Sequence, residues 1–156
     1  MSGPAQPERD ANAALAPRQS VGRLIKQVYA SLIRRIDQRM QPLELTAMQW
    51  EPMLLVHFGK ADTVAALARE SHVNCGAMTR MLDRLEEKQL LRRRRSDEDR
   101  RVVHLELTEK GRKVADEIMP LIREELNVHL RDFTPEEVAT LVGLLERMLR
   151  NAAQEE

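Results

Sequence analysis

Aromatic residues are scarce in this sequence: Tyr29, Trp50, Phe58 and Phe133 make up 3% of its 156 residues. Aliphatic side chains must therefore build the core, and a core of Leu, Ile, Met and Ala favours helices. Proteins that bind single-stranded nucleic acids stack bases on aromatic side chains, so the shortage also counts against that class.

Cysteine and long apolar runs are nearly absent as well. Cys75 is the only cysteine, so no disulfide can form within one chain. No stretch approaches the ~18 apolar residues that a membrane span requires. Residues 1–17 are polar, with no apolar centre that would make a signal peptide. We expect a mobile N-terminal tail at 1–17, a protein with no membrane segment, and a cytoplasmic location.

The sequence also shows no clustering of the residue types that bind metals or carry out catalysis. His57, His72, His104 and His129 are scattered, with no pair at a helical three- or four-residue spacing and no thiol cluster beside them. We therefore expect no metal site. The sequence also lacks a phosphate-binding loop and a nucleophile elbow, so we expect neither a cofactor nor an enzyme.

The charge is balanced overall but uneven along the chain. There are 25 basic and 25 acidic residues, yet residues 60–101 hold 11 basic against 8 acidic groups, and residues 102–156 hold 7 against 12. Binding to a polyanion depends on the local field, so the middle of the chain is the place to look for a nucleic-acid site.

Helical periodicity dominates both ends of the chain. Between Arg18 and Met40 the apolar residues recur every three or four positions, and Pro42 ends the pattern. Thr46 and Gln49 fit a capping box for a helix that ends at Gly59, with Pro52 expected to bend it. Thr108 is the expected cap of a helix to about Leu130, kinked at Pro120. Residues 134–137, TPEE, form a second capping box before the last helix.

The middle of the chain predicts a winged helix-turn-helix. A short helix at 63–71 precedes a turn, and Asn74 is the expected cap of a helix from Cys75 to Lys88. The runs LLRRRR and VVHLEL, separated by a polar tip, predict a β-hairpin. The fold class is therefore mainly α with a small β-hairpin wing, and the DNA-binding part spans about 46–107.

The helix after Asn74 has the two faces of a recognition helix. At 100° per residue, Met78, Met81, Leu82 and Leu85 share the inward face. Small residues near its start allow entry into a major groove, and polar residues face the DNA. The same pattern fits an amphipathic surface helix that does not bind DNA, so the choice between the two interpretations depends on the hairpin that follows. The expected contacts on this helix are Asn74, Gly76, Ala77, Thr79, Arg80 and Arg84.

The hairpin carries four consecutive arginines, residues 92–95, followed by a tip with two more. So much positive charge is unfavourable in a hairpin unless it meets a polyanion. Alternation puts about two of the four on each face, so some can instead pair with Asp97, Glu98 or Glu86. The expected DNA contacts here are Arg95, Asp99, Arg100 and Arg101.

Residues 67–112 resemble the MarR family of winged helix-turn-helix transcriptional regulators. The resemblance rests on MTRMLDRLEEK at 78–88, the DRR of the wing at 99–101, LTEKGR at 107–112 and, more loosely, LTAMQW at 45–50. It implies a homodimer on a palindromic operator in double-stranded DNA, with the wing arginine near the minor groove. Asp99 and Arg101 match the family's wing pair, in which the carboxylate holds the arginine. Gln89 departs from the family's usual glycine, so the helix exit is expected to differ.

The outer helices, about 18–40 and 109–153, are the expected dimerisation region of a single domain spanning 18–156. Each presents an apolar stripe outside the DNA-binding unit, and the alternative is that these stripes pack only within their own chain.

A ligand site is expected where the two parts join. The resemblance implies a small anionic effector, and an aromatic carboxylate suits the residue types present. The candidates are Arg23, Tyr29, Trp50, Met53, His57 and His72, although aromatic residues at helical spacing are equally well core residues.

The sequence thus predicts a repressor that a small aromatic acid releases from DNA. Two alternatives stay open: a redox-switched regulator through Cys75, whose thiol opens the recognition helix, and a helical interaction module that does not bind DNA.

Overall fold

The computed structural model describes residues 20–46 and 48–154. It confirms the mainly helical fold class with one two-stranded antiparallel hairpin. The expected tail at 1–17 lies outside the described residues. The elements are, in order, α1 (Val21–Met40), the 3-10 turn η2 (Gln41–Leu43), α2 (Trp50–His57), α3 (Val64–Glu70), α4 (Cys75–Glu87), β1 (Leu91–Arg95), β2 (Val103–Leu107), α5 (Glu109–His129) and α6 (Pro135–Ala153).

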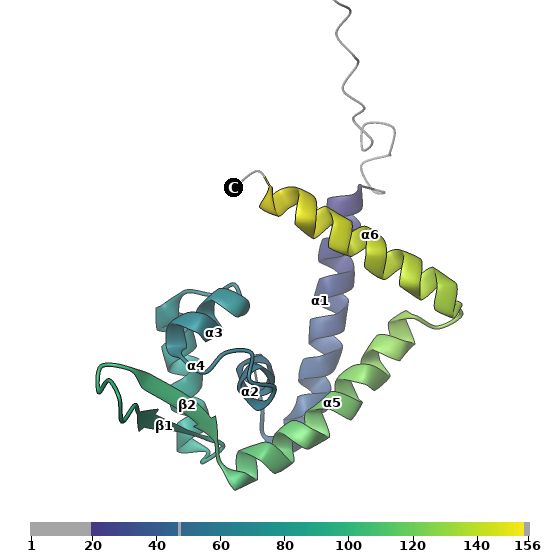
Figure 1. The fold of residues 1–156 in the computed structure, drawn as a ribbon. Helices are drawn as coiled ribbons and strands as arrows, with labels where there is room; N and C mark the ends of the chain where they lie inside the picture. The colour runs from purple at the N-terminus through teal and green to yellow at the C-terminus, as the bar shows by residue number, and fades with distance from the viewer. Residues whose placement is uncertain (1–19, 47, 155–156) are drawn as a thin grey trace, which may run out of the picture.

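Two parts of the molecule are visible in Figure 1. Helices α2, α3 and α4 and the hairpin form one lobe, and α1, α5 and α6 extend from it. Helix α5 starts directly after β2 and runs away from the lobe to the turn before α6. The chain order therefore links the hairpin to the outer helices through a single continuous helix.

The core of the lobe is aliphatic, as the composition requires. Met78, Leu82 and Leu85 of α4 are fully buried and belong to one cluster with Met53 of α2 and Leu105 of β2. The inward face expected for α4 is thereby confirmed, with Met81 packed half-buried at its edge.

Side-chain caps begin most of the helices, and each satisfies an amide that the first turn leaves free. The Thr134–Glu137 capping box is complete, with hydrogen bonds of 3.2 and 2.8 Å in the two directions. The residues whose side chains cap a helix are Thr63, Asn74, Thr108 and Thr134.

The start of α2 was predicted wrongly. The Gln49 side chain accepts the Thr46 backbone N–H at 3.1 Å, but the helix begins only at Trp50. Met48 has a φ of 63°, so the backbone cannot be helical there. Pro52 therefore lies in the first turn, where its missing N–H removes no helical hydrogen bond. Helix α5 continues through Pro120 without interruption.

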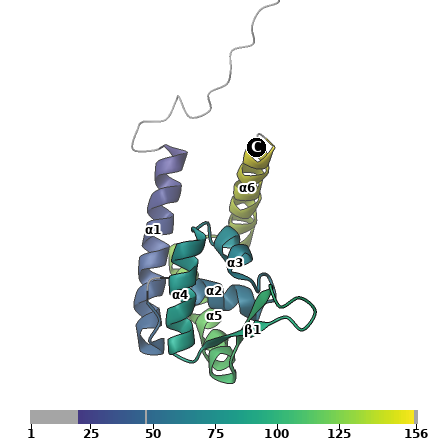
Figure 2. The ribbon, with the colours of Figure 1, turned by 90° about the vertical axis from the view of Figure 1, so that its left-hand side faces the viewer.

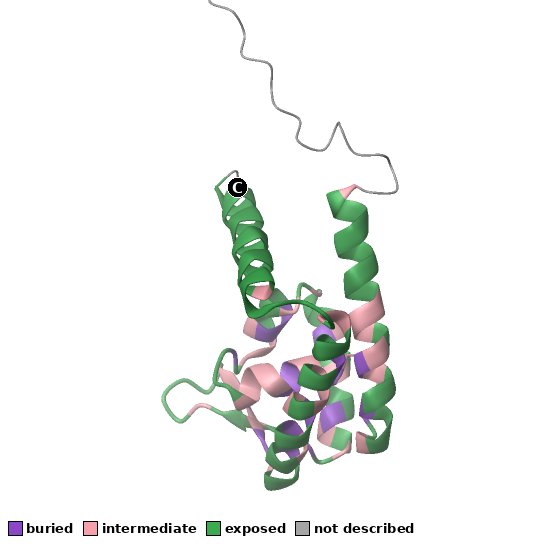
Figure 3. Cartoon of the chain, turned by 90° about the vertical axis from the view of Figure 1, so that its right-hand side faces the viewer, coloured by how far each residue is buried: buried purple, intermediate pink, exposed green. Residues whose placement is uncertain are grey.

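Helix α1 and helix α6, which follows the far end of α5, form two separate arms that stand apart in Figure 2. The first ten residues of α1 and almost all of α6 are exposed, as Figure 3 shows. The exposed apolar residues of the two arms are Val21, Leu24, Ile25 and Val28 in α1 and Leu141, Val142, Leu144, Leu145, Met148 and Leu149 in α6.

Within the described ranges, every helix is too short or too polar to span a bilayer.

Candidate nucleic-acid interface

Helix α4 has a buried apolar face and an opposite face open to solvent. Thr79, Arg80 and Arg84 are exposed on that open face, as is Gly76, while Ala77 lies half-buried at its margin. The residues expected to touch DNA on this helix are therefore accessible together. The assignment of contacts to bases or phosphates stays a prediction.

The start of α4 is organised by Asn74. Its Oδ1 accepts the Ala77 backbone N–H at 2.8 Å, so this oxygen is engaged and the side-chain amide nitrogen is the group left for a partner. Thr79 donates its hydroxyl to the Cys75 carbonyl at 2.8 Å, so its oxygen keeps only acceptor capacity. The exposed first turn still offers amide N–H groups of the kind that bind phosphate.

Helix α4 ends in a left-handed residue, although that residue is Gln89 and not glycine. Gln89 has a φ of 58°. Its N–H donates to the Glu86 carbonyl at 2.9 Å, and the Leu90 N–H donates to the Leu85 carbonyl at 3.0 Å. These two bonds define a Schellman motif. The expectation that the exit would differ was wrong, since the motif forms despite the side chain.

Three of the four consecutive arginines in β1 are neutralised by carboxylates of the same chain. Arg92 donates to Glu106 at 2.9 and 3.1 Å, and Arg94 lies 3.3 Å from the same carboxylate. Arg93 bonds Glu86 and, at 2.6 Å, Asp83. The sequence-based expectation found Glu86 but missed the other two partners. Asp97 and Glu98, also named as candidates, form no ion pair among the described residues.

These ion pairs favour the charged forms of the side chains that make them. Partial burial alone would lower the pKa of the Arg93 guanidinium, but its hydrogen bonds to Asp83 and Glu86 outweigh burial and raise it. The hydrogen bond from Arg92 lowers the pKa of Glu106, and the nearby charges of Arg94 and Arg112 add to this. Most of the strand's positive charge is thus structural, and the cations left for an external anion lie at the tip.

The wing tip is shaped by main-chain hydrogen bonds. Ser96 Oγ accepts the N–H groups of Glu98 and Asp99 at 3.2 and 3.3 Å. The Asp99 carboxylate accepts the Arg101 backbone N–H at 2.9 Å, and the Val102 N–H donates to the Asp99 carbonyl, also at 2.9 Å. The carboxylate therefore holds the arginine by its backbone. Arg95, Arg100 and Arg101 are exposed around this turn.

The wing is also fastened to the loop before α3. The Leu105 N–H donates to the Asp62 carbonyl at 2.7 Å, and His104 Nδ1 lies 2.8 Å from Asp62 Oδ2. This contact fixes the orientation of the hairpin relative to the helix-turn-helix. The sequence did not predict the contact between His104 and Asp62, because these two residues lie 42 positions apart.

A second fastening was missed, at the end of α4. Lys88 Nζ donates to the Glu44 carbonyl and, at 3.0 Å, to the side-chain oxygen of the buried Gln49. Glu44 follows η2 and Gln49 directly precedes α2, so this lysine ties the end of the recognition helix to the segment between α1 and α2. A Gln in a capping pattern gave no sign of this second role.

The six candidate ligand residues are distributed over α1, α2 and the turn before α4. Trp50 and Met53 are core residues, and the Trp50 indole N–H donates to Asp37 at 3.1 Å. Tyr29 is 55% exposed on α1, and Arg23 lies further along the same arm. His57 lies at the far end of α2, where Nε2 is 3.4 Å from Asp116.

His72 lies in the turn between α3 and α4, with a φ of 52°. There burial raises the pKa of the Glu51 carboxyl, and the charge of His72 opposes that rise.

A shallow cavity of about 310 Å³ lies between α2, β2 and α5. His57 is the one ligand candidate that lines it, together with Val56, Leu105, Glu106, Leu107 and Arg112. The Arg112 guanidinium donates to the Leu107 carbonyl at 2.8 Å. The cavity thus has the guanidinium of Arg112 and the carboxylate of Glu106 in its lining, and neither residue was among the ligand candidates expected from the sequence.

Cys75 is exposed at the first position of α4. In the part of the chain that the structure describes, no three His, Cys, Asp or Glu residues are placed to hold a metal ion.

Comparisons with known proteins agree with this architecture. The MarR family model matches residues 45–103. The Multiple antibiotic resistance protein MarR of Escherichia coli is 33% identical over 130 residues, which cover 83% of this chain and 90% of that protein. Its counterpart from Salmonella typhimurium is 32% identical over the same share of each chain.

Solved structures resemble most of the chain as well. The reduced form of MarR from E. coli matches with a TM-score of 0.74 and 31% identity, covering 86% of this chain and 98% of that one. A cysteine-to-serine mutant of MarR from E. coli, complexed with operator DNA, matches with a TM-score of 0.74 and 32% identity, covering 82% and 92%. The helix-turn-helix, the wing and the flanking helices all fall within this likeness, and the chain therefore belongs to the MarR family of winged helix-turn-helix transcriptional regulators.

Proposed function

We propose that the protein is a homodimeric regulator that binds a palindromic operator in double-stranded DNA. The observation that carries the proposal is the joint exposure of the α4 polar face and the three tip arginines of the wing, while Arg92–Arg94 are neutralised within the chain. Positive charge is thus concentrated where a wing would meet DNA. The operator complex of E. coli MarR, with the same fold, supports this interpretation.

In this proposal α4 enters the major groove by its N-terminal half. Gly76 and Ala77 allow close approach, Thr79 accepts a hydrogen bond from a base, and Arg80 and Arg84 reach bases or phosphates. The side-chain amide of Asn74 and the first-turn N–H groups face a phosphate. The wing then carries Arg101 to the neighbouring minor groove, with Arg95, Asp99 and Arg100 around it.

The exposed arms support the dimer. An exposed apolar surface on both α1 and α6 is unfavourable in water for a single chain. A dyad that pairs these arms with a second copy buries that surface, and it places two recognition helices on successive major grooves about 34 Å apart. This makes 46–107 the DNA-binding part and the helices within 18–40 and 109–153 the dimerisation part of one domain.

The test begins with duplexes that the purified wild-type protein selects from a random-sequence pool. We expect an inverted repeat among them. Arg101→Ala should weaken binding to this duplex by about 1–3 kcal/mol and reduce the salt dependence. Arg80→Ala should weaken it comparably, and Thr79→Ala should change base preference. Arg150→Ala, which removes an equal charge from the exposed end of α6, serves as the matched control.

Two results would contradict the proposal. Selection of no duplex at any salt concentration would favour the alternative of a helical module that does not bind DNA. Binding that is lost equally in Arg150→Ala and Arg101→Ala would mean that general charge, and not the wing, carries the affinity.

We further propose that the protein is a repressor and that a small aromatic carboxylate releases it from DNA. An effector that binds a DNA-incompetent arrangement must lower DNA affinity, and DNA must lower effector affinity by the same factor. Trp50 is a suitable reporter, because its indole bridges α2 to Asp37 of α1. Titrating benzoate and salicylate against Trp50 fluorescence, with and without the selected duplex, tests both directions. Release by oxidation of Cys75 without any effect of the acids would favour the redox alternative.

A further inference from the structure

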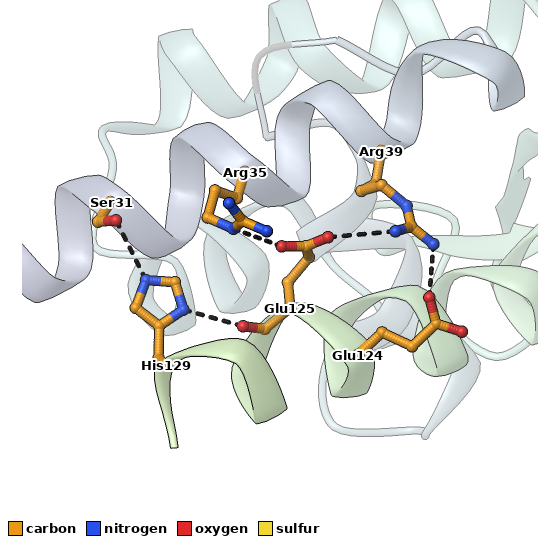
Figure 4. Close-up of polar contacts among 6 residues, drawn as sticks. All are labelled: Ser31, Arg35, Arg39, Glu124, Glu125 and His129. Atoms are coloured by element: carbon orange, nitrogen blue, oxygen red, sulfur yellow. Dashed lines mark hydrogen bonds and ion pairs between the residues drawn. The ribbon is translucent and has the colours of Figure 1, made fainter. Parts of the chain in front are cut away.

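A buried carboxylate joins α1 to α5. Glu125 is 3% exposed, the most buried charged residue among those the structure describes. Arg35 Nε donates to its Oε2 at 2.6 Å and Arg39 Nη1 donates to its Oε1 at 3.2 Å. Figure 4 shows the carboxylate of α5 held between these two guanidinium groups of α1. Both of its oxygens are thus engaged from the same neighbouring helix.

Two further contacts extend the junction along α1. Arg39 Nη2 donates to Glu124 at 2.5 Å. His129 Nε2 lies 3.1 Å from the Ser31 hydroxyl, and its Nδ1 lies 2.8 Å from the Glu125 carbonyl. Residues 31, 35 and 39 are successive positions on one face of α1, so one turn of α5 is attached across two turns of α1 (Figure 4).

Such a junction tolerates only one relative placement of the two helices. An ionised carboxylate taken out of water is strongly destabilising unless it is paired and hydrogen-bonded. Sliding or rotating α5 on α1 would leave Glu125 buried without one of its partners, whereas apolar contacts alone lose little in a small slide. The ion pairs therefore contribute more to fixing the relative placement of α1 and α5 than to the stability of their contact.

The other end of α5 is fixed to the lobe. A Cβ on Gly111 would overlap the Leu90 carbonyl, and the Thr108 N–H donates to that carbonyl at 3.1 Å. Lys88 ties the end of α4 to the segment that follows α1, and the Leu45 N–H in this segment donates to the Met40 carbonyl at the end of α1 at 3.2 Å. Helices α1, α4 and α5 therefore form a closed frame, and the Glu125 junction is the corner nearest the exposed arms.

We propose that Glu125 is a positioning residue for DNA recognition: through Arg35 and Arg39 it fixes the angle between the lobe and the arms, and so the separation of the two recognition helices. This rests on the proposed homodimer. Glu125 itself lies on the outer-helix side of the molecule and touches no proposed DNA contact.

The chain offers a direct test, because Cys75 is its only cysteine and is exposed on the recognition helix. A nitroxide attached there reports one distance between the two subunits by pulsed electron spin resonance. In wild type we expect one narrow distance distribution. Glu125→Gln keeps the shape but removes the charge that both arginines neutralise, and it should broaden the distribution and add new distances.

Glu117→Gln is the matched control. It makes the same change on α5, at an exposed carboxylate that lies outside the junction and forms no ion pair among the described residues. Its distribution should stay close to wild type. Arg35→Gln removes one of the two pairs of Glu125 and should broaden the distribution as well, so the proposal stays testable if Glu125→Gln does not fold.

A functional measurement separates positioning from stability. If the variant dimer occupies the competent separation about a tenth of the time, its affinity for the selected duplex falls about tenfold. The loss should shrink on duplexes whose half-sites are one base pair closer or further apart, which a merely destabilised protein would not show. Suppose that Glu125→Gln and Arg35→Gln both form stable dimers, with a distance distribution as narrow as that of wild type and the same preference for half-site spacing. This result would overturn the inference about Glu125 and leave the proposed homodimer standing. A monomeric wild-type protein would overturn the proposed homodimer and this inference with it.

Discussion

Gln89 holds a backbone conformation that its side chain disfavours. With a φ of 58° it closes the Schellman motif at the end of α4, and its carbonyl accepts the Thr108 hydroxyl at 2.6 Å. Both interactions use only its backbone, and the side chain is exposed. The left-handed conformation is therefore sterically unfavourable for Gln89, and its side chain makes no hydrogen bond to the described residues that would offset this.

We predict that Gln89→Gly stabilises the protein. The left-handed conformation costs an L-residue about 1–2 kcal/mol, and the greater freedom of glycine in the unfolded chain takes back about 0.5–1 kcal/mol. The expected gain is about 0.5–1 kcal/mol, measured by urea unfolding at one fixed protein concentration. Gln38→Gly, at an exposed position inside α1, should instead lose about 1 kcal/mol. A loss in both variants would mean that the Gln89 side chain makes a contact in solution.

A second prediction concerns how Asp99 acts on the wing arginine. Its carboxylate accepts the Arg101 backbone N–H, and an Asn side chain offers the same acceptor without the charge. Asp99→Asn should therefore bind the selected duplex nearly as wild type does, while Asp99→Ala should bind about fivefold more weakly, which corresponds to about 1 kcal/mol for one hydrogen bond. Fluorescence anisotropy at two salt concentrations measures both. Equal losses in the two variants would show that the carboxylate acts by pairing with the guanidinium.

Which residues the sequence reveals depends on how far away their partners are. Asn74 was predicted correctly as a cap because its partner is three residues along the chain. Glu106 as the partner of Arg92, Asp62 as that of His104 and Gln49 as that of Lys88 were missed, since these pairs lie 14, 42 and 39 positions apart. The arginine run was expected to be partly paired, but only Glu86 was found among its partners, and three of its four members are paired.

At the scale of elements, the packing of α5 against the end of α4 depends on a glycine. A Cβ on Gly111 would overlap the Leu90 carbonyl, and backbone cannot give way as a flexible side chain can. Gly111→Ala should destabilise the protein by at least about 2–3 kcal/mol and loosen the wing. The matched change is Gly143→Ala inside α6, where a Cβ has open space and should stabilise by about 1 kcal/mol. Thermal unfolding of both variants tests the pair, and a mild effect of Gly111→Ala would contradict the close approach.

Elements with strong local signals were predicted well, and the exception has a tertiary cause. Helices α3, α4, α5 and α6 begin within a residue or so of their expected starts, because each has a capping side chain that the sequence displays. The segment before α2 has the same signal in Thr46 and Gln49, yet Gln49 is buried and shared with Lys88. A tertiary contact there overrides the local pattern, and the helix starts later.

The whole molecule is neutral, yet its charges and apolar surfaces are segregated. The tip arginines lie at the end of the wing, and the apolar residues without partners lie on the arms at the other end of the molecule (Figure 1). Composition could suggest two functional regions but not their opposite placement, which depends on the direction of α5.

The last prediction concerns the arms. In α6, Leu141, Leu144, Leu145 and Met148 share one face and are 37–45% exposed. A charge at the middle of this face should prevent pairing without affecting the lobe, so Leu145→Glu should give a folded monomer by sedimentation and circular dichroism. Each lobe would then bind alone, and affinity for the selected duplex should fall about 100-fold or more, because the second half-site is no longer tethered. Ala139→Glu puts the same group on the opposite, exposed face of α6 and should remain a dimer with wild-type affinity. A dimeric Leu145→Glu protein would move the interface elsewhere, and a monomer with undiminished affinity would contradict the need for two linked recognition helices.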